Sequence, residues 1–287
     1  MHHVQARSKA LFVVATLAIS CALVAPARAT QLDVSEDFVS TPIGKCATIA
    51  PGTPPYRSST SRTADTYRKI GTSGEGRPIW AEHWGTPTGP QVLVIGQIHG
   101  DECSPAFLVE AIRQKGPTKF GLWLIPTLNP DALAKGSRFT PNGVDINRDG
   151  YALRTPEARA LMAFTRSVKP VLTVHIHSPY GFVGSRNGGV ATNAANAIAR
   201  ASGWSQWQGS GTLAGSRGNR GFLWDGQERV LARHRSILIE LPATSKLEAA
   251  GAPQPARRVI TTPAKLRTLA SRIRDALYAS VTTKPTR

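Results

Sequence analysis

A histidine and a glutamate stand three positions apart at the end of an apolar run. Residues 92–98 read VLVIGQI, and His99-Gly100-Asp101-Glu102 follows directly. A His-x-x-Glu spacing can place one nitrogen and one oxygen ligand on the same metal ion. By itself the pattern is weak, because a solvated turn that is rich in charge is a more common reason for such a tetrapeptide.

Two other apolar runs also contain groups that can do chemistry. His175 and His177 stand two positions apart in PVLTVHIH (170–177), so both side chains point to the same face of a strand. Glu240 lies inside the apolar run SILIEL (236–241), where an unpaired carboxylate is energetically costly. Two histidines and one carboxylate with an open fourth position form a catalytic zinc site, and a separate carboxylate can serve as its general base.

Each of these residues also has a simpler explanation. A histidine on a strand is more often a satisfied core residue, and Glu240 could be half of a buried ion pair. The joint occurrence of such residues at separate strand ends favours a metal site, because α/β proteins gather their functional groups at the carboxyl ends of strands.

The strands that would carry these groups alternate with helical segments. Apolar patterns predict strands at 92–98, 121–128, 170–176 and 236–241, and helices around 107–112, at 155–168, at 187–202 and around Leu266–Leu277. This alternation predicts an α/β fold of one domain, with an open, mostly parallel (mixed) twisted sheet flanked by helices. Two long segments, 129–150 and 204–226, are predicted to be loops, and loops of that length are usually functional or disordered.

The N-terminal segment, residues 1–29, has the pattern of a secretory signal peptide. Arg7 and Lys9 precede an apolar run, and Ala27-Arg28-Ala29 supplies the small residues that a signal peptidase reads. We expect cleavage near Ala29 and a periplasmic or secreted protein. Cys21 raises a lipoprotein alternative, but the residues before it match a lipobox poorly.

Downstream of this segment, residues 30–62 read as an irregular lead-in that is rich in Ser, Thr and Pro, and residues 63–287 as the catalytic domain. Nothing else in the sequence is long and apolar enough to cross a bilayer. Cleavage would leave 258 of the 287 residues, which is enough for one large domain with a substantial core.

The chain is strongly basic. Its formal charge is +17, and the three basic residues of the signal segment leave +14 on the remainder. Such a charge favours an anionic partner. Export argues against nucleic acid, and an anionic wall polymer or a substrate with several carboxylates suits the compartment better. A generally basic, well-solvated surface is an equally good explanation.

Two cysteines, Cys46 and Cys103, follow the signal segment. They could pair in an oxidising compartment, although the sequence does not reveal the distance between them. Two distant thiols do not resemble a cysteine-based zinc site.

Several motifs occur in the order that is typical of the zinc carboxypeptidase family, M14. They are HGDE (99–102), NPD (129–131), Arg138 upstream of GVDINR (143–148), IHS (176–178) and IELP (239–242). The chain resembles the murein peptide amidase branch of that family over roughly residues 67–245. Each motif alone is modest, but their order along the chain is specific.

The resemblance implies a zinc-carboxypeptidase-like fold, one zinc ion per chain and a role for each matching residue. His99, Glu102 and His177 match the metal ligands, with His175 as the fallback for the third. Glu240 matches the general base that deprotonates the zinc-bound water, and Arg138 the arginine that stabilises the oxyanion. Asn147 and Arg148 match the pair that binds the terminal carboxylate of the substrate.

The nearby aspartates are expected to support the site. Asp145 and Asp101 are more plausible as turn residues or as partners of the ligand histidines than as catalysts, and Asp101 could instead cap the following helix. Without the resemblance, Arg138 and Arg148 would be taken as surface charges of a loop.

The chain departs from the family pattern at three points. Ala132 stands where the family usually has Gly, and Gly150 followed by Tyr151 where it usually has an aromatic residue. Residues 204–224 contain no match to the substrate-covering tyrosine. Trp207, Arg217, Arg220, Trp224 and Tyr180 are the candidates for that wall.

Three functions fit these observations. The first is an exported zinc metallopeptidase that hydrolyses an amide bond in murein peptides, near the γ-D-glutamyl–diaminopimelate junction, with ordinary carboxypeptidase activity as a close variant. The second is a deacylase of small N-acyl amino acids, of the aspartoacylase and succinylglutamate desuccinylase type. The third is a non-catalytic basic protein that binds wall material. The intact set His99, Glu102, His177 and Glu240 favours an enzyme, and export favours the first function.

Overall fold

The computed structural model describes residues 64–186, 188–208, 221–232, 234–244, 248 and 259–282. These residues belong to one compact unit, which runs from Gln31 to Arg287. The predicted signal peptide (1–29) and lead-in (30–62) lie outside the described residues, so export remains an expectation from the sequence.

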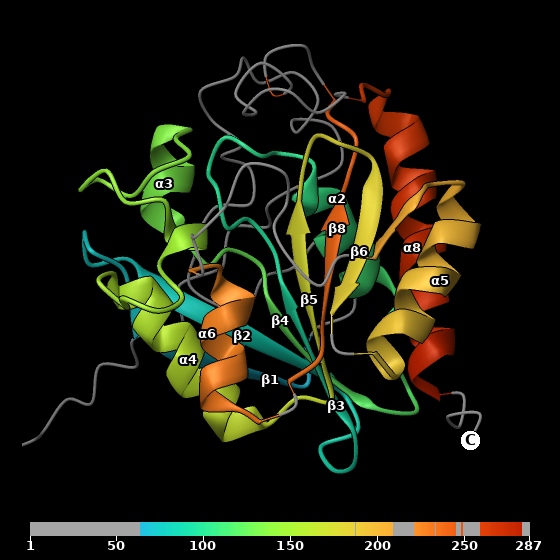
Figure 1. Cartoon of the computed structure of the whole chain (residues 1–287), viewed down its shortest axis with the longest axis horizontal. Helices are drawn as coiled ribbons and strands as arrows, with labels where there is room; N and C mark the ends of the chain where they lie inside the picture. The colour runs from blue at the N-terminus through green and yellow to red at the C-terminus, as the bar shows by residue number, and fades with distance from the viewer. Residues whose placement is uncertain are drawn as a thin grey trace, which may run out of the picture. The chain divides into compact units, whose positions relative to one another are not determined.

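The described residues form an eight-stranded mixed sheet in the order β1-β2-β4-β3-β5-β8-β6-β7 (Figure 1). Its four central strands run parallel, and antiparallel pairings join β1 to β2, β2 to β4, and β6 to β8. The strands are β1 (Thr66–Thr72), β2 (Pro78–Gly85), β3 (Gln91–Ile95), β4 (Gly121–Ile125), β5 (Leu172–His177), β6 (Phe182–Arg186), β7 (Gln206–Gln208) and β8 (Ser236–Glu240). The predicted class, an open, mixed sheet flanked by helices, is confirmed.

The four strands that the sequence predicted are the four central, parallel ones. Strands that are covered on both faces read as continuous apolar runs, which explains why these were visible in the sequence. On β3 the faces alternate, because Val92 and Val94 pack into one core and Leu93 and Ile95 into the other. β3 ends at Ile95, three residues before the predicted boundary, and the chain then turns toward His99.

Helices cover both faces of this sheet (Figure 1). The helices α2 (Pro105–Gln114), α5 (Val190–Ser202) and α8 (Pro263–Thr282) supply buried side chains to one core. The helices α4 (Pro156–Val168) and α6 (Leu223–Val230) supply the other. Thr155 caps α4, with its hydroxyl oxygen accepting from the N–H of Ala158 at 3.2 Å.

The central strands β5 and β8 present apolar side chains to only one of these cores. Leu172, Val174 and Ile176 pack with α2, α5 and α8, as do Ile237 and Ile239 of β8. Because side chains alternate along a strand, the two histidines of β5 and Glu240 of β8 lie on the opposite face, which α4 and α6 cover. One face of these strands therefore builds the core while the other carries the candidate chemistry.

Part of the predicted loop 204–226 is regular structure, which corrects the sequence reading. Residues 206–208 form β7, which pairs in parallel with β6, and residues 223–226 are the first turn of α6. The Gly-rich composition of the segment hides these two short elements. The second predicted loop, 129–150, contains the short helix α3 (Pro130–Lys135) and the 3-10 turn η1 (Ile146–Arg148).

Cys103 is disulfide-bonded, and its partner lies outside the described residues. A pairing with Cys46, which the sequence left open, is consistent with the state of Cys103. In the part of the chain that the structure describes, no helix is both long and apolar enough to cross a membrane.

A buried ion pair joins the sheet to α2. Arg113 donates to both carboxylate oxygens of Glu82 on β2, at 2.5 and 3.2 Å, and both side chains are almost completely buried. The indole N–H of Trp84 donates to the same carboxylate at 3.3 Å. The pair thus fixes α2, whose N-terminus follows the His99–Glu102 turn, against the antiparallel side of the sheet.

We expect Arg113→Met to lower the free energy of unfolding by about 3–5 kcal/mol, because it leaves the carboxylate of Glu82 buried without its cation. The double variant Glu82→Leu/Arg113→Met should recover most of the loss, since it removes both charges. Chemical denaturation of the three proteins measures this. A single variant as stable as the parent would show that the pair contributes nothing.

Candidate metal centre

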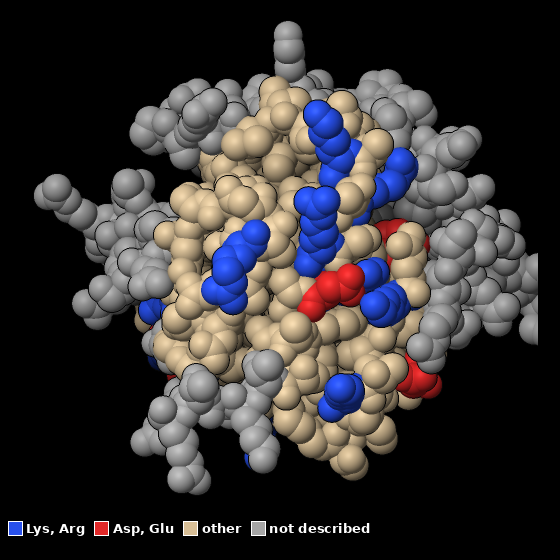
Figure 2. Space-filling model, turned by 90° about the vertical axis from the view of Figure 1, so that its right-hand side faces the viewer, with Lys and Arg blue, Asp and Glu red and all other residues tan. Residues whose placement is uncertain are grey.

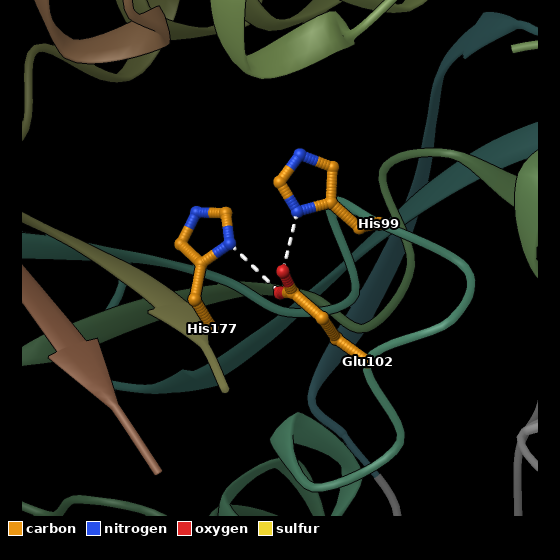
Figure 3. A group of neighbouring side chains, drawn as sticks. All are labelled: His99, Glu102 and His177. Carbon is orange, nitrogen blue, oxygen red and sulfur yellow. Dashed lines mark hydrogen bonds and ion pairs between the residues drawn. The ribbon is translucent and has the colours of Figure 1, made fainter. Parts of the chain in front are cut away.

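Three side chains from two strand ends meet at one point of the fold (Figure 3). His99 and Glu102 lie in the turn that follows β3, and His177 is the last residue of β5. One potential ligand atom from each lies within 4.8 Å of the other two, and all three residues are buried. In the described part of the chain this is the group of His, Cys, Asp and Glu residues arranged as a metal site.

The carboxylate of Glu102 lies between the two imidazole rings. Its Oε1 is 2.6 Å from Nδ1 of His99, and its Oε2 is 2.8 Å from Nδ1 of His177 (Figure 3). Burial alone would raise the pKa of Glu102, but the two histidines lower it overall. The carboxylate is therefore held ionised, which is the state that binds a metal ion.

The donor set fits zinc. Two imidazole nitrogens and one carboxylate form the three-protein-ligand set of hydrolytic zinc sites, which leave a further position open for water or substrate. Both Nδ1 atoms face the shared carboxylate, so an ion at this point would be held by these two nitrogens and by Glu102.

The outer nitrogens of the two rings have partners of their own. Nε2 of His99 is 3.0 Å from Oδ1 of Asp145, and Nε2 of His177 is 3.3 Å from the side-chain amide of Asn147. A carboxylate on the outer nitrogen of a ligand histidine fixes the ring orientation and leaves the inner nitrogen free to bind metal. Asp145 has the supporting position that the sequence suggested.

Asn147 can serve His177 in the same way. Its Oδ1 is buried and has no hydrogen-bond partner, while its Nδ2 faces the histidine. Exchanging the oxygen and nitrogen of the amide lets Oδ1 accept from the Nε2–H of a neutral His177. Asn147 therefore lies where it can orient a ligand, and its predicted role in substrate binding stays a prediction.

Arg138 reaches the same cluster from the loop after α3. It donates two hydrogen bonds to Oδ2 of Asp145, at 2.9 and 3.1 Å, and its Nη1 lies 3.5 Å from Oε1 of Glu102. The fork with Asp145 holds the guanidinium in place, and the remaining Nη1 faces the metal cluster. This is the placement needed to stabilise negative charge that develops beside a bound ion.

Arg148 lies further out and packs against an aromatic surface. Its guanidinium lies 4.1 Å from the ring centroid of Phe222, and that ring stacks on Trp224 with centroids 4.5 Å apart. Its hydrogen bond is to the neighbouring carbonyl of Asn147. A planar guanidinium fixed on a ring leaves its edge free for a carboxylate. Sequence reasoning missed Phe222, which stands among glycines and carries no motif.

Glu240 lies directly across the sheet from His177, since the two are partners in the β5–β8 register. It is buried, and its Oε2 has no hydrogen-bond partner. Burial raises the pKa of Glu240 well above its ordinary value, and the charge of Glu102 raises it further, while Arg138 opposes them. The sequence predicted a lone carboxylate beside the ligands, and the structure places Glu240 beside His177. Its raised pKa makes it a stronger proton acceptor than an ordinary glutamate.

The fallback ligand, His175, does not join the ligand group. It is fully buried, its Nε2 lies 2.8 Å from the amide oxygen of Gln227, and burial lowers its pKa to about 3. His175 is thus a neutral core histidine, as the simpler explanation held.

Asp101 does not cap α2, because Ser104 has the cap position and makes no side-chain capping bond. Burial raises the pKa of Asp101 to about 6.

Two glycines permit the close approaches that build the site. A Cβ at Gly100 would lie 2.1 Å from the backbone of Ala132, so only glycine lets the ligand turn pack against α3. A Cβ at Gly150 would lie 1.9 Å from the carbonyl oxygen of Phe222, and Gly226 packs closely on Gly150. The departure at position 150 therefore has a physical reason, since this loop contacts the start of α6 directly.

The candidates for a substrate-covering residue divide into two groups. Arg217 and Arg220 lie outside the described residues, and so does the side chain of Trp207. Trp224 is buried beneath Phe222, and Tyr180 stacks on Phe182 with ring centroids 6.4 Å apart. The ring contacts of Trp224 and Tyr180 are with other aromatic residues and not with His99, Glu102 or His177.

Part of the sequence matches a family of deacylases. Residues 88–164 match the succinylglutamate desuccinylase/aspartoacylase catalytic domain. A curated relative, carboxypeptidase SOL1 from Arabidopsis thaliana, is 27% identical over 136 residues, which is 38% of this chain and 28% of the relative. The chain therefore spans less than a third of that protein.

Solved structures share the fold over most of the chain. A metallo-carboxypeptidase from Burkholderia cenocepacia has a TM-score of 0.59 at 20% identity, covering 75% of this chain and 64% of its own. One from Pseudomonas aeruginosa, in complex with (2-guanidinoethylmercapto)succinic acid, has 0.56 at 20%, covering 76% and 65%. Murein-tripeptide amidase MpaA from Escherichia coli O157 has 0.51 at 19%, covering 78% and 94%. The chain has the metallocarboxypeptidase fold, which confirms the resemblance at the level of the fold.

Gly100→Ala should weaken zinc binding by an order of magnitude or more, because the added methyl group pushes the turn between His99 and Glu102 away from α3. Overpacking of this kind also costs about 1–3 kcal/mol of stability. Gly74→Ala is the matched control, since a Cβ there would meet its nearest atom at an ordinary 3.6 Å. Competition with a fluorescent zinc chelator measures the affinity, and equal affinities for both variants would contradict the packing argument.

Proposed function

We propose that this chain, which has the metallocarboxypeptidase fold, is an exported zinc-dependent hydrolase that cleaves an amide bond in murein-derived peptides. The observation that carries the proposal is the convergence of His99, Glu102 and His177, with Glu240 beside them in register with His177. Such a set of ligands and a separate buried carboxylate have a direct use in amide hydrolysis.

The chemistry divides among the residues by their surroundings. Zinc, when bound, would lower the pKa of a coordinated water to about 7 and so supply a nucleophile at neutral pH. Glu240 would take up the proton at its unpartnered Oε2 and deliver it to the leaving nitrogen, since a carboxylate with a raised pKa can both accept and return a proton. Arg138, held by Asp145, would stabilise the negative charge that forms on the carbonyl oxygen.

Substrate recognition is assigned to the outer arginine. Arg148 on the ring of Phe222 would bind a terminal carboxylate, because a planar guanidinium can make two parallel hydrogen bonds to it. The carboxylate would then place the adjacent amide bond toward the cluster formed by His99, Glu102 and His177.

The charge of the molecule supports an anionic substrate. In the described chain more acidic than basic side chains are buried. The buried arginines are Arg113 and Arg274, and the buried acids are Glu82, Glu102, Asp131, Asp149, Glu157, Asp225, Glu240 and Glu248. The outer surface is therefore more basic than composition alone indicates. On the face that carries α8, Lys and Arg outnumber Asp and Glu (Figure 2), including Lys265, Arg267 and Arg272. Peptides with several carboxylates would be attracted to the molecule as a whole, since α8 covers the face of the sheet opposite the candidate site.

A deacylase of small N-acyl amino acids is the second candidate, because residues 88–164 match that family of enzymes. The matched segment contains the proposed ligands His99 and Glu102 and the arginines Arg138 and Arg148. Guanidinium groups suit the carboxylate of an N-acyl amino acid as well as that of a peptide. The predicted signal peptide and the structural similarity to a murein-tripeptide amidase favour the first candidate.

We expect Glu240→Gln to lower the turnover number by about 100-fold or more, because the amide cannot accept the proton. Zinc content should stay at one ion per chain, since Glu240 is not among the three proposed ligands. Asp275→Asn, which removes an exposed carboxylate on α8, the helix that covers the opposite face of the sheet, should behave as the parent. Metal analysis and initial rates on the same preparations decide this, and full activity in the Glu240 variant would refute the assignment of the base.

A substrate panel separates the two candidate functions and the non-catalytic alternative. We expect mass spectrometry to detect cleavage of muropeptides that contain γ-D-glutamyl–diaminopimelate and loss of that cleavage with a zinc chelator. N-acetylaspartate and N-succinylglutamate should remain intact. Preferential cleavage of these small acyl substrates would favour the deacylase, and wall binding without metal or cleavage would favour a binding protein.

A further inference from the structure

Glu248 is a buried carboxylate with no part in the proposed chemistry. Only 4% of the residue is exposed, yet its carboxylate accepts hydrogen bonds from three different residues. The donors are the N–H of Ser104 at 2.8 Å, the hydroxyl of Ser178 at 2.7 Å, and the N–H and hydroxyl of Thr244 at 2.9 and 3.2 Å.

These donors belong to the three segments that carry the candidate site. Ser104 stands two residues after Glu102, Ser178 directly follows His177, and Thr244 stands four residues after Glu240. They are far apart in the sequence, since Glu248 lies 144 residues from Ser104 and 70 from Ser178. One carboxylate thus connects the chain just beyond β3, β5 and β8.

The two oxygens of Glu248 are used in different ways. Oε1 accepts from both Ser104 and Ser178, and so joins the ligand turn after β3 to the end of β5. Oε2 accepts both bonds from Thr244, which stands four residues before Glu248. Hydrogen bonds to an ionised acceptor are about twice as strong as neutral ones. Oε1 therefore holds the Glu102 and His177 segments at a fixed separation.

We propose that Glu248 is a positioning residue that clamps the Glu102 and His177 segments together and thereby sets the affinity of the metal site. The inference rests on the proposed function, because it takes His99, Glu102 and His177 to be zinc ligands. β3 and β5 pair only as far as Ile95 and His175, so the ligands lie beyond the last paired residues of that ladder. The clamp supplies a fixed connection where the ladder has ended.

The competing explanation is that Glu248 only anchors its own segment. Under that explanation the bonds from Thr244 are the important ones, and loss of the carboxylate would lower the stability of the protein without changing its zinc affinity or ligand geometry. Under the clamp, the bonds from Ser104 and Ser178 matter, and losing the carboxylate would change zinc affinity and ligand geometry.

Glu248→Gln tests this, because the side-chain amide keeps only one acceptor oxygen, and even when that oxygen faces Ser104 and Ser178 their hydrogen bonds lose the charge of the carboxylate. Glu157→Gln is the matched control, since it neutralises an equally buried carboxylate in the first turn of α4, which accepts from the N–H of Gly74 at 3.0 Å. Zinc affinity is measured by chelator competition on purified protein with its disulfide intact, and the visible spectrum of the cobalt-substituted protein reports ligand geometry. We expect zinc affinity about 10–100-fold weaker and an altered spectrum in Glu248→Gln only. Equal affinity in both variants would overturn the clamp.

Variants that each remove one donor provide a second test if Glu248→Gln fails to fold. Ser178→Ala removes one of the two bonds at Oε1 and should weaken zinc binding, while Thr244→Val removes the hydroxyl bond at Oε2 and should not. Equal effects would overturn the clamp. The parent protein separates this inference from the proposed function: tight zinc binding without cleavage of any substrate would refute the function alone, and absence of zinc binding would refute both.

Discussion

Several carboxylates lie at one edge of the sheet, and the structure depends on giving each a different partner. Like charges that are buried together cannot all stay ionised unless cations or donors compensate them. Glu102 lies between two histidines, Asp145 accepts a fork from Arg138, and Glu248 accepts from N–H and hydroxyl groups. Glu240 has one carboxylate oxygen with no partner. Ligand, orienting acid, clamp and base thus differ by their surroundings rather than by residue type.

The strand register turns these partnerships into a site. Parallel pairing of β3, β5 and β8 brings segments together that are far apart in sequence, and it puts His177 beside Glu240. Alternation of side chains then sends Val174 and Ile176 into the core under α2, α5 and α8 and turns the histidines to the other face. The same short strands therefore provide both the stability and the chemistry, and a slip by one residue would exchange the two.

The sequence predicted the parts of this molecule that leave a local pattern. The four central strands were visible because burial on both faces requires continuous apolar runs, and Glu240 was visible because a carboxylate interrupts one. Strand β1 was missed because its residues are exposed or half-buried, and β2 because the buried Glu82 and His83 interrupt its apolar residues. Strand β7 was missed because it has three residues in a Gly-rich segment. Glu248 and Phe222 were missed because their roles arise from contacts with distant residues, which no spacing rule records. His175 and His177 looked alike in sequence, and only the contact with Gln227 separates the core histidine from the ligand.

The deacylase match and the fold similarity describe different extents of the chain. The deacylase match ends at residue 164, so it includes the turn of His99 and the loop of Arg138 and Arg148 but neither His177 nor Glu240. Those residues belong to the β5–β8 half of the sheet, where the structural similarity to metallocarboxypeptidases continues. The first half holds the proposed metal turn and the arginines proposed to contact the substrate, which would suit any substrate with an amide and an acidic group. We therefore expect any discrimination between a peptide and a small acyl amino acid to come from the second half, where Phe222 packs beneath Arg148 and Trp224 beneath Phe222.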